Sequence, residues 1–418
     1  MEVHKNSQNR VVEREPSKFP SRLGMALLIG PAGWLGAYVG LAATLLPSQI
    51  GVISPAHKVA LVALFSTVAM TVSTIANIVF GALSDMTRSK HGSRTPWIIG
   101  NSIVSAIFLV FLAYSKSITL MLVMWALFEI ASNGVVAPMV AQISDRVPKK
   151  WQGSISSFYA VGMAIGNYGS GVIAAQFLNN VMTGIIFFAG WALVLGLVSA
   201  WLAHEPSNVG DVQNKITLKE ILANFTVPTH NAKDYYLALI GKLLMVTGQY
   251  IIVGYQLYIL KDYMNLNSSA AAKTLALMST CLMITGIFCP AIIGPITDKI
   301  HRVKLPVAIT TCLLGIGAFL PFIDPRPWTM IAYGIIAGIG MGCYSSVDQV
   351  LNIQVLPDKQ SAAKDLGIIN LANTAGMVLG PIVAALVISL MGYHAIFPIE
   401  TLICFIGGGI IMFIKSVK

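Results

Sequence analysis

The chain has 418 residues, of which 56% are hydrophobic and only 11% are charged, and its mean hydropathy is +0.74. A soluble globular protein carries about 25% charged residues, so most of this surface must face something other than water. The composition excludes a cytosolic enzyme, a disordered scaffold and a secreted disulfide-rich module, and it predicts an integral membrane protein.

Twelve hydrophobic stretches are long enough to cross the hydrocarbon layer of a bilayer, which takes about 20 mainly apolar residues per helix. Charged or turn-rich segments separate these stretches. The spans are predicted over residues 23–48, 58–82, 96–115, 118–143, 154–177, 180–203, 235–260, 270–297, 305–323, 328–352, 366–391 and 394–414. The fold class that follows is an all-α membrane protein with twelve transmembrane helices.

Most of the 27 lysines and arginines fall in the tails and loops on one side of this topology. Positive charge of this kind marks the cytoplasmic side of a membrane protein. We therefore expect a multi-pass protein of the cell membrane, with the tails 1–22 and 415–418 in the cytoplasm. The same distribution explains the net charge of +10 without a nucleic-acid partner.

A long hydrophilic connection over residues 204–234 divides the spans into an N-terminal bundle, 23–203, and a C-terminal bundle, 235–414. Within this connection, apolar and charged side chains alternate over residues 216–225. That pattern fits a short amphipathic helix on the membrane surface, and it also fits a plain cytoplasmic linker.

Two short motifs recur at nearly half the length of the chain. Gly81–Asp85 (GALSD) after the second span is echoed by Gly294–Asp298 (GPITD) after the eighth. Val147–Lys150 (VPKK) is echoed by Leu356–Lys359 (LPDK). These echoes indicate duplication, and repeated six-helix halves with a substrate site between them are typical of secondary transporters.

The loop after the second span carries the most specific motif. Residues 81–97 read GALSDMTRSKHGSRTPW, which resembles the signature loop of the major facilitator superfamily. The long form of this loop is similar to the branch of glycoside–cation symporters and sucrose–proton cotransporters. Segments similar to the superfamily or to this branch also occur at residues 144–153, 255–258, 346–349 and 363–367. The resemblance implies two pseudo-symmetric six-helix bundles that work by alternating access.

This resemblance also implies a network of charges that locks the inner ends of the bundles while the protein opens outward. Asp85 ends the second span, where a carboxylate can meet the positive N-terminus of another helix, and Arg88 or Arg94 can reach Asp145. The alternative is a set of solvated charges that only fix topology. The candidate gating residues are Asp85, Arg88, Arg94, Asp145, Asp298 and Arg302.

Four charged residues lie within predicted spans and away from the first turn of the span: Glu129, Lys242, Asp348 and Glu400. A charge at the centre of a spanning helix costs roughly 2.5 to 3.5 kcal/mol, so such residues usually face the interior of the bundle. The resemblance implies that helices 1, 4, 7 and 10 line the central cavity. The first three charges lie on those helices, whereas Glu400 lies on a peripheral helix and is treated as structural.

The candidate proton-coupling residues are Glu129, Lys242 and Asp348. Lys242 and Asp348 are expected at similar depth, where they form either a static salt bridge or a pair that opens during transport. Glu129 has no basic residue at its depth in its own half. A carboxyl group in an apolar cavity can bind and release a proton, or it can stay protonated and bonded to Asn133 or a neighbour.

Aromatic and amide side chains on the spans can bind a polyol, because sugar hydroxyls need donors and acceptors while C–H faces stack on rings. Some of the tyrosines also fit the aromatic belt at a membrane interface. The candidate substrate-binding residues are Tyr38, Asn133, Gln249, Tyr255, Gln256 and Tyr344, with Tyr159, Asn167 and Asn370 as weaker candidates.

We therefore expect a monomeric, proton-coupled importer of a small polar solute, a sugar or glycoside, and no enzyme. Ser73 and Asn77 stand where melibiose-type sodium symporters carry acidic residues, so a proton is favoured over sodium. The five cysteines lack the spacing of a metal site, so neither metal nor cofactor is expected. The alternatives are proton-driven efflux of drugs or metabolites and a non-transporting membrane sensor.

Overall fold

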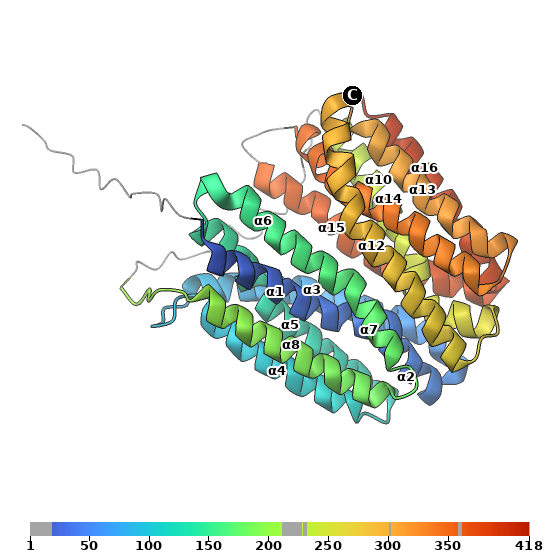
Figure 1. Ribbon diagram of the computed structural model, residues 1–418, viewed down its shortest axis with the longest axis horizontal. Coiled ribbons are helices and arrows are strands. Elements are labelled where there is room, and N and C mark those ends of the chain that lie inside the picture. The colour runs from blue at the N-terminus through green and yellow to red at the C-terminus, as the bar shows by residue number, and fades with distance from the viewer. Residues whose placement is uncertain (1–18, 211–227, 229–231, 301, 358–361, 418) are drawn as a thin grey trace, which may run out of the picture.

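The computed structural model describes residues 19–210, 228, 232–300, 302–357 and 362–417, and the regular secondary structure of this part of the chain is all helical, without strands (Figure 1). The possible amphipathic helix at 216–225 lies outside the described residues. So do the side chains of a few residues within helices, among them Asp298.

The N-terminal half contains six spans joined by short loops. Its first span and its fifth span are each continuous through a π-helical turn, at Leu41–Leu45 and Ile165–Gly169. The helices are α1 (Ser21–Gly40), α2 (Leu46–Ile53), α3 (Lys58–Met86), α4 (Thr95–Ala113), α5 (Ile118–Arg146), α6 (Lys149–Ala164), α7 (Ser170–Gln176) and α8 (Val181–Ala203).

The C-terminal half repeats this arrangement, and its first span also ends in a π-helical turn, at Ile259–Tyr263. A short 3₁₀ turn at Tyr393–Ala395 precedes the last helix. The helices are α10 (Lys233–Val253), α11 (Gln256–Tyr258), α12 (Ser268–Ile300), α13 (Lys304–Ile323), α14 (Pro327–Gln354), α15 (Ala362–Met391) and α16 (Ile396–Met412).

Eleven helices of the described chain are long and apolar enough to cross a membrane. The remaining span, α6 with α7, is the one that the sequence places at 154–177. It begins earlier, at Lys149, and it is interrupted by its π-helical turn and carries more polar residues than the others. It nevertheless packs beside α1, as a spanning helix of the bundle does (Figure 1). The twelve-span architecture is thus confirmed.

The spans alternate in direction, so both ends of the described chain, Phe19 and Val417, lie at one face of the bundle. We call this the terminal face and the other the opposite face. Several helices begin at the opposite face with a side-chain cap: Ser117, Asn180 and Asn267 each accept a backbone N–H three residues ahead. Such caps satisfy amide groups that a helix start leaves unpaired.

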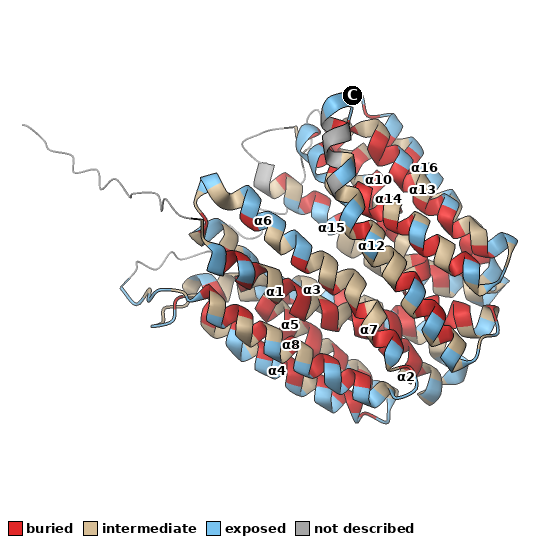
Figure 2. Ribbon diagram, viewed as in Figure 1, coloured by how far each residue is buried: buried red, intermediate tan, exposed pale blue. Residues whose placement is uncertain are grey.

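Buried residues lie on the helix faces that meet their neighbours, while the outer faces are exposed (Figure 2). These outer faces are apolar: Phe111, Val194 and Leu390, for example, are exposed large hydrophobic residues on α4, α8 and α15. Contiguous apolar surface of this extent marks contact with a non-aqueous partner. The helices therefore present their hydrophobic outer faces to lipid.

Close helix contacts depend on small residues, as the glycine pairs of the sequence suggest. A methyl group added at Gly162 in α6 would collide with the backbone oxygen of Leu28 in α1. One added at Gly338 in α14 would collide with the hydroxyl of Thr285 in α12. Small residues let helix backbones approach closely in membranes, so these glycines fix the packing within each half.

Polar contacts join the two halves at the opposite face. Lys58 Nζ lies 2.6 Å from Asp262 Oδ2, which also accepts a hydrogen bond of 2.9 Å from Tyr393. The hydroxyl of Tyr258 donates to the backbone oxygen of Pro47 at 2.7 Å. Lys58 and Pro47 belong to the N-terminal half and the other residues to the C-terminal half, so the halves are held together at this face.

Candidate functional site

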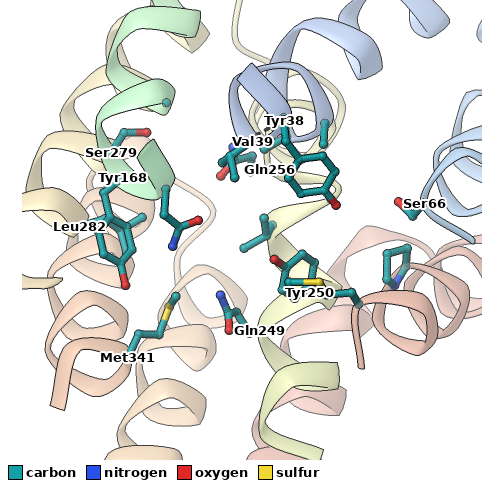
Figure 3. A pocket seen from close by; sticks show the side chains of 18 of the residues that line it. Tyr38, Val39, Ser66, Tyr168, Gln249, Tyr250, Gln256, Ser279, Leu282 and Met341 are labelled. Atoms are coloured by element: carbon teal, nitrogen blue, oxygen red, sulfur yellow. Dashed lines mark hydrogen bonds between the residues drawn. The ribbon is translucent and has the colours of Figure 1, made fainter. Parts of the chain in front are cut away.

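A cavity lies between the halves, from the middle of the bundle toward the opposite face, with a volume of about 80 Å³. Typical small-molecule sites enclose about 300 to 1,000 Å³, so this central cavity is contracted here. Aromatic, amide and hydroxyl side chains from both halves line it (Figure 3). The polar and aromatic lining residues are Tyr38, Ser66, Asn167, Tyr168, Gln249, Tyr250, Gln256, Ser279 and Tyr333.

Three of the six candidate substrate-binding residues line this cavity: Tyr38, Gln249 and Gln256. Tyr38 stacks on Trp125 with ring centroids 5.9 Å apart, which fixes the plane of the phenol. The side-chain amide of Gln256 donates to the backbone oxygen of Ala43 at 3.3 Å, across the boundary between the halves.

The structure places Tyr255 and Tyr344 elsewhere. The hydroxyl of Tyr255 lies within hydrogen-bond distance of the backbone oxygens of Val59 and Pro381, at 2.9 and 3.0 Å. Tyr255 therefore joins the two halves instead of lining the cavity. Tyr344 is buried one turn before Asp348 in α14 and is likewise absent from the cavity wall.

The sequence did not single out Tyr168, Tyr250, Ser279 or Tyr333 as lining residues. Two weak signals were available: Tyr168 follows the candidate Asn167, and Tyr250 follows the candidate Gln249. Both adjacent pairs line the cavity, so neighbouring residues of one helix can both face it; Tyr168, Gln249 and Tyr250 are labelled in Figure 3.

A second cavity of about 540 Å³ lies between α3 and α15, in the half of the bundle nearer the terminal face. Its size falls within the range of small-molecule sites, about 300 to 1,000 Å³. Its lining includes Asn133, the remaining candidate for substrate binding. The polar lining residues are Ser73, Thr74, Asn77, Asn133, Lys364, Asn370 and Thr374.

Glu129 is buried in α5, with a side chain only 3% exposed. Its Oε2 accepts a hydrogen bond of 2.6 Å from the hydroxyl of Ser73 in α3, and its Oε1 has no partner among the described residues. Asn133 bonds to the backbone oxygen of Glu129, not to its carboxyl group, and accepts a hydrogen bond from Asn77. The carboxyl group thus has one hydroxyl partner and no cation.

Lys242 and Asp348 form an ion pair with Nζ and Oδ2 2.8 Å apart, and the two residues are 3% and 5% exposed. The sequence predicted this proximity from their depth. Two amides complete the pair: Asn352 donates to Asp348 at 2.8 Å, and Lys242 donates to Asn370 at 3.3 Å. Buried charges need such partners, because desolvation is costly.

The second cavity connects these two groups. Ser73 lines it from α3 and holds Glu129, while Asn370 lines it from α15 and holds Lys242. A solute in this cavity therefore meets Ser73, the partner of Glu129, on one wall. On the other wall it meets Asn370, the partner of Lys242.

At the terminal face, the predicted charge network forms around Arg94. Its guanidinium pairs with Asp85 and with Asp145, the latter through bonds of 3.0 and 2.7 Å to Oδ2, and it donates to Ser84 at 2.6 Å. Burial lowers the pKa of Arg94, but the hydrogen bonds and charges of Asp145 and Asp85 outweigh it, so the pKa is raised and the residue stays charged. Arg88 instead donates to the backbone oxygens of Asp85 and Thr87.

The carboxylate that meets the N-terminus of α4 belongs to Glu205. The sequence had suggested Asp85 for such a contact with a helix N-terminus. Oε2 of Glu205, after α8, accepts hydrogen bonds from the backbone N–H groups of Arg94 and Thr95 at 2.8 and 2.9 Å. A negative charge is favourable at this end of a helix. Gly92, with a φ of +80°, leaves room for Glu205, because a side chain there would collide with it.

The second half does not show an equivalent network among its described side chains. Arg302 is exposed, and the side chain of Asp298 lies outside the described part. The gating role of both residues stays a prediction. Within the described residues, His, Cys, Asp and Glu form no group of three that could hold a metal ion.

Replacing Arg94 by lysine should lower stability, because lysine cannot reproduce the forked contacts with Asp85, Asp145 and Ser84. Loss of one hydrogen bond between charged groups costs about 1.5–3 kcal/mol, and we expect a decrease of this size in the free energy of unfolding. Thermal unfolding of the purified protein measures it. Arg302→Lys is the matched control and should change little; equal effects of the two variants would contradict the network.

Comparison with known proteins agrees with this architecture. The profile of the Major Facilitator Superfamily matches residues 24–272 and 237–417. A search among curated proteins finds no match.

Two similar solved structures are of a bacterial homolog of the human lysosomal transporter Spinster, inward-facing and either unoccupied or occupied. Their TM-scores are 0.69 and 0.71 and their identities 14% and 15%, and each comparison covers 96% of this chain and 99% of the other. A variant of the nucleoside transporter NupG has a TM-score of 0.70 and 16% identity over 93% of this chain and 99% of that one. At these identities the likeness concerns the fold, while the profile spans nearly the whole sequence: the chain belongs to the major facilitator superfamily of membrane transporters.

Proposed function

We propose that this transporter imports a small polar solute, a sugar or glycoside, together with protons. The observation that carries the proposal is the cavity between the halves, lined by tyrosines and by the amides of Asn167, Gln249 and Gln256. Phenol rings stack on the C–H faces of a sugar ring, and amides both donate to and accept from its hydroxyl groups. The sequence resemblance to glycoside and sucrose cotransporters supports the same class of substrate.

Glu129 is the proposed proton-coupling group. An ionised carboxylate in a buried site with only one hydroxyl partner is strongly disfavoured, so the group holds a proton in this conformation. Ser73 connects it to the second cavity, from which water can reach it when the halves move. Proton binding and solute binding are thereby linked, because both depend on the same boundary between the halves.

The conformation of the transporter follows from which face is closed. Positive residues of the loops, such as Arg88, Arg94 and Lys149, lie at the terminal face, which supports a cytoplasmic position for it. The halves are joined at the opposite face, and the larger cavity lies nearer the terminal face. We therefore interpret this conformation as inward-facing.

Uptake into proteoliposomes tests this function. We expect a proton gradient to drive accumulation of at least one labelled sugar from a panel of mono- and disaccharides, with collapse of the gradient by an ionophore abolishing it. Labelled nucleosides and a cationic dye complete the panel. Gradient-driven extrusion of the dye, without sugar uptake, would instead support efflux.

Neutralising Asp262 should favour opening at the opposite face, because Asp262→Asn removes the ion pair with Lys58 and weakens the bond with Tyr393. Spin labels at exposed Val52 and Ile323, in a background without native cysteines, report the separation of the halves at this face. The distance distribution should shift toward longer values.

The matched control for this measurement is Asp324→Asn. Asp324 lies at the same face, but its partners Arg326 and Trp328 belong to the same half. The control should leave the distance distribution unchanged. An identical distribution for Asp262→Asn would show that the ion pair does not hold the halves together.

A further inference from the structure

The central cavity and the second cavity follow one another along the boundary where α3 of the N-terminal half packs beside α15 of the C-terminal half. Ser66 of α3 lines the central cavity, and Ser73, two turns nearer the terminal face, lines the second cavity. Met377 and Asn370 repeat this order on α15. Seven residues of a helix span about 10 Å, so the second cavity is displaced by this distance toward the terminal face.

The walls of the two cavities differ in their chemistry. Tyrosines line the central cavity, whereas no aromatic residue lines the second cavity among the residues that the structure describes. An aromatic ring offers a face on which a sugar ring can stack, while hydroxyl and amide groups hold a solute only through hydrogen bonds. The second cavity is therefore suited to a polyhydroxylated solute, which it binds more weakly than the central cavity does.

Both walls of the second cavity keep hydrogen-bonding groups available to such a solute. The hydroxyl of Ser73 donates to Glu129, which leaves the lone pairs of its oxygen able to accept a hydrogen bond. The side-chain oxygen of Asn370 accepts from Lys242, and its amide nitrogen donates to no residue in the described part of the chain. One solute hydroxyl can thus donate to Ser73 while another accepts from Asn370.

We propose that the second cavity is a second binding site for the transported sugar, which the molecule occupies after the central cavity on its way to the terminal face. There the sugar bridges Ser73 on α3 and Asn370 on α15. It thereby contacts the hydrogen-bond partners of both Glu129 and Lys242. The inference rests on the proposed function for the class of solute and adds a site that shares no lining residue with the central cavity.

Filling the second cavity while leaving the central cavity unchanged tests this inference. Gly367 lines the second cavity from α15, and a methyl group added there would meet nothing within 4 Å. Leucine is also a better helix former than glycine, so Gly367→Leu should fold. The matched control is Gly409→Leu on α16, where an added methyl group likewise meets nothing within 4 Å and no cavity described above is lined.

The purified proteins are titrated with labelled glucose, galactose, sucrose and melibiose. For a sugar that is bound, the wild type should show a tighter and a weaker site. Gly367→Leu should lose the weaker site and keep the affinity of the tighter one, because only the second cavity is filled. Gly409→Leu should keep both sites.

A second measurement reports on the second cavity directly and remains informative if Gly367→Leu does not fold. Thr374 lines this cavity, so Thr374→Cys, in a background without native cysteines, should react with a small water-soluble thiol reagent. A bound sugar should slow this reaction several-fold. Adding Gln249→Ala, which weakens binding in the central cavity, should leave the sugar concentration for half-maximal protection unchanged.

Two results would overturn the second site: a single sugar-binding site in the wild type, or protection of Thr374→Cys that shifts together with the central affinity in Gln249→Ala. If either occurs while sugar uptake remains proton-driven, the proposed function stands without the second site. If both sites bind sugar but uptake does not depend on protons, the proposed symport is wrong and the second site remains. If none of the four sugars binds, the second site and the proposed class of solute are both wrong.

Discussion

Glu129→Gln should abolish proton-driven accumulation of the solute while leaving exchange of labelled for unlabelled solute intact. Glutamine has nearly the same shape as a protonated glutamic acid and can still accept the hydrogen bond from Ser73. It cannot lose a proton, so the step that links the proton gradient to reorientation of the empty transporter is removed. Exchange needs only the loaded transporter to reorient, and it therefore continues.

Uptake and exchange in the same proteoliposome preparation measure this prediction. Asp324→Asn is the matched control, because Asp324 is an acid in a loop, paired with Arg326 in its own half. The control should accumulate solute as the wild type does. Undiminished accumulation in Glu129→Gln would exclude Glu129 as the coupling group, and loss of both uptake and exchange would indicate a structural defect.

Lys242→Gln should cause the largest loss of stability among the variants considered. It leaves the charge of Asp348 buried without a cation, and removal of one partner from a buried ion pair costs about 3–5 kcal/mol. The reverse change, Asp348→Asn, should have an effect of similar size. Thermal unfolding in detergent measures both, with Lys273→Gln, at an exposed position of α12, as the control that should change little.

The double variant Lys242→Gln/Asp348→Asn decides between a static pair and one that opens during transport. It removes both charges but keeps side chains that can bond to Asn352 and Asn370, so most of the stability should return. If the pair must open and close, the double variant should be stable yet transport poorly. A stable double variant with wild-type transport would show that the pair only holds α10 and α14 together.

Hydropathy and charge were sufficient to predict the architecture, because a spanning helix needs a long apolar segment and its flanking charges fix direction. Counting residues from the helix ends also placed Lys242 and Asp348 at one depth, and the structure has them 2.8 Å apart. Depth along a helix is a property of sequence spacing alone. The span beginning at Lys149 was predicted too short, because its first turn is polar.

The rotation of each helix was harder to predict, since one tyrosine on a span does not show which way it points. Tyr255 lies at the break between α10 and α11, where regular helical spacing is interrupted, and its hydroxyl meets the backbone of Val59. Glu205 could not be found by spacing at all, because it is about 110 residues from Arg94 in sequence and bonds to it only after α8 packs against α4.

The choice between Arg88 and Arg94 also needed the structure. Both residues are close enough in sequence to reach Asp145, and only the turn of the loop decides which one does. Arg94 immediately precedes α4, so its side chain extends between the ends of α3 and α5. Arg88 remains near the end of α3 and donates to backbone oxygens there.

The most direct test of the central claim is the movement of protons when only a solute gradient is imposed. Proteoliposomes that enclose a pH-sensitive dye, with equal pH inside and outside, receive on the outside a sugar that the uptake panel has identified. Symport predicts that the lumen becomes acidic as the sugar enters, and that Glu129→Gln abolishes this acidification. An alkaline lumen, or sugar entry without any change of pH, would contradict the account.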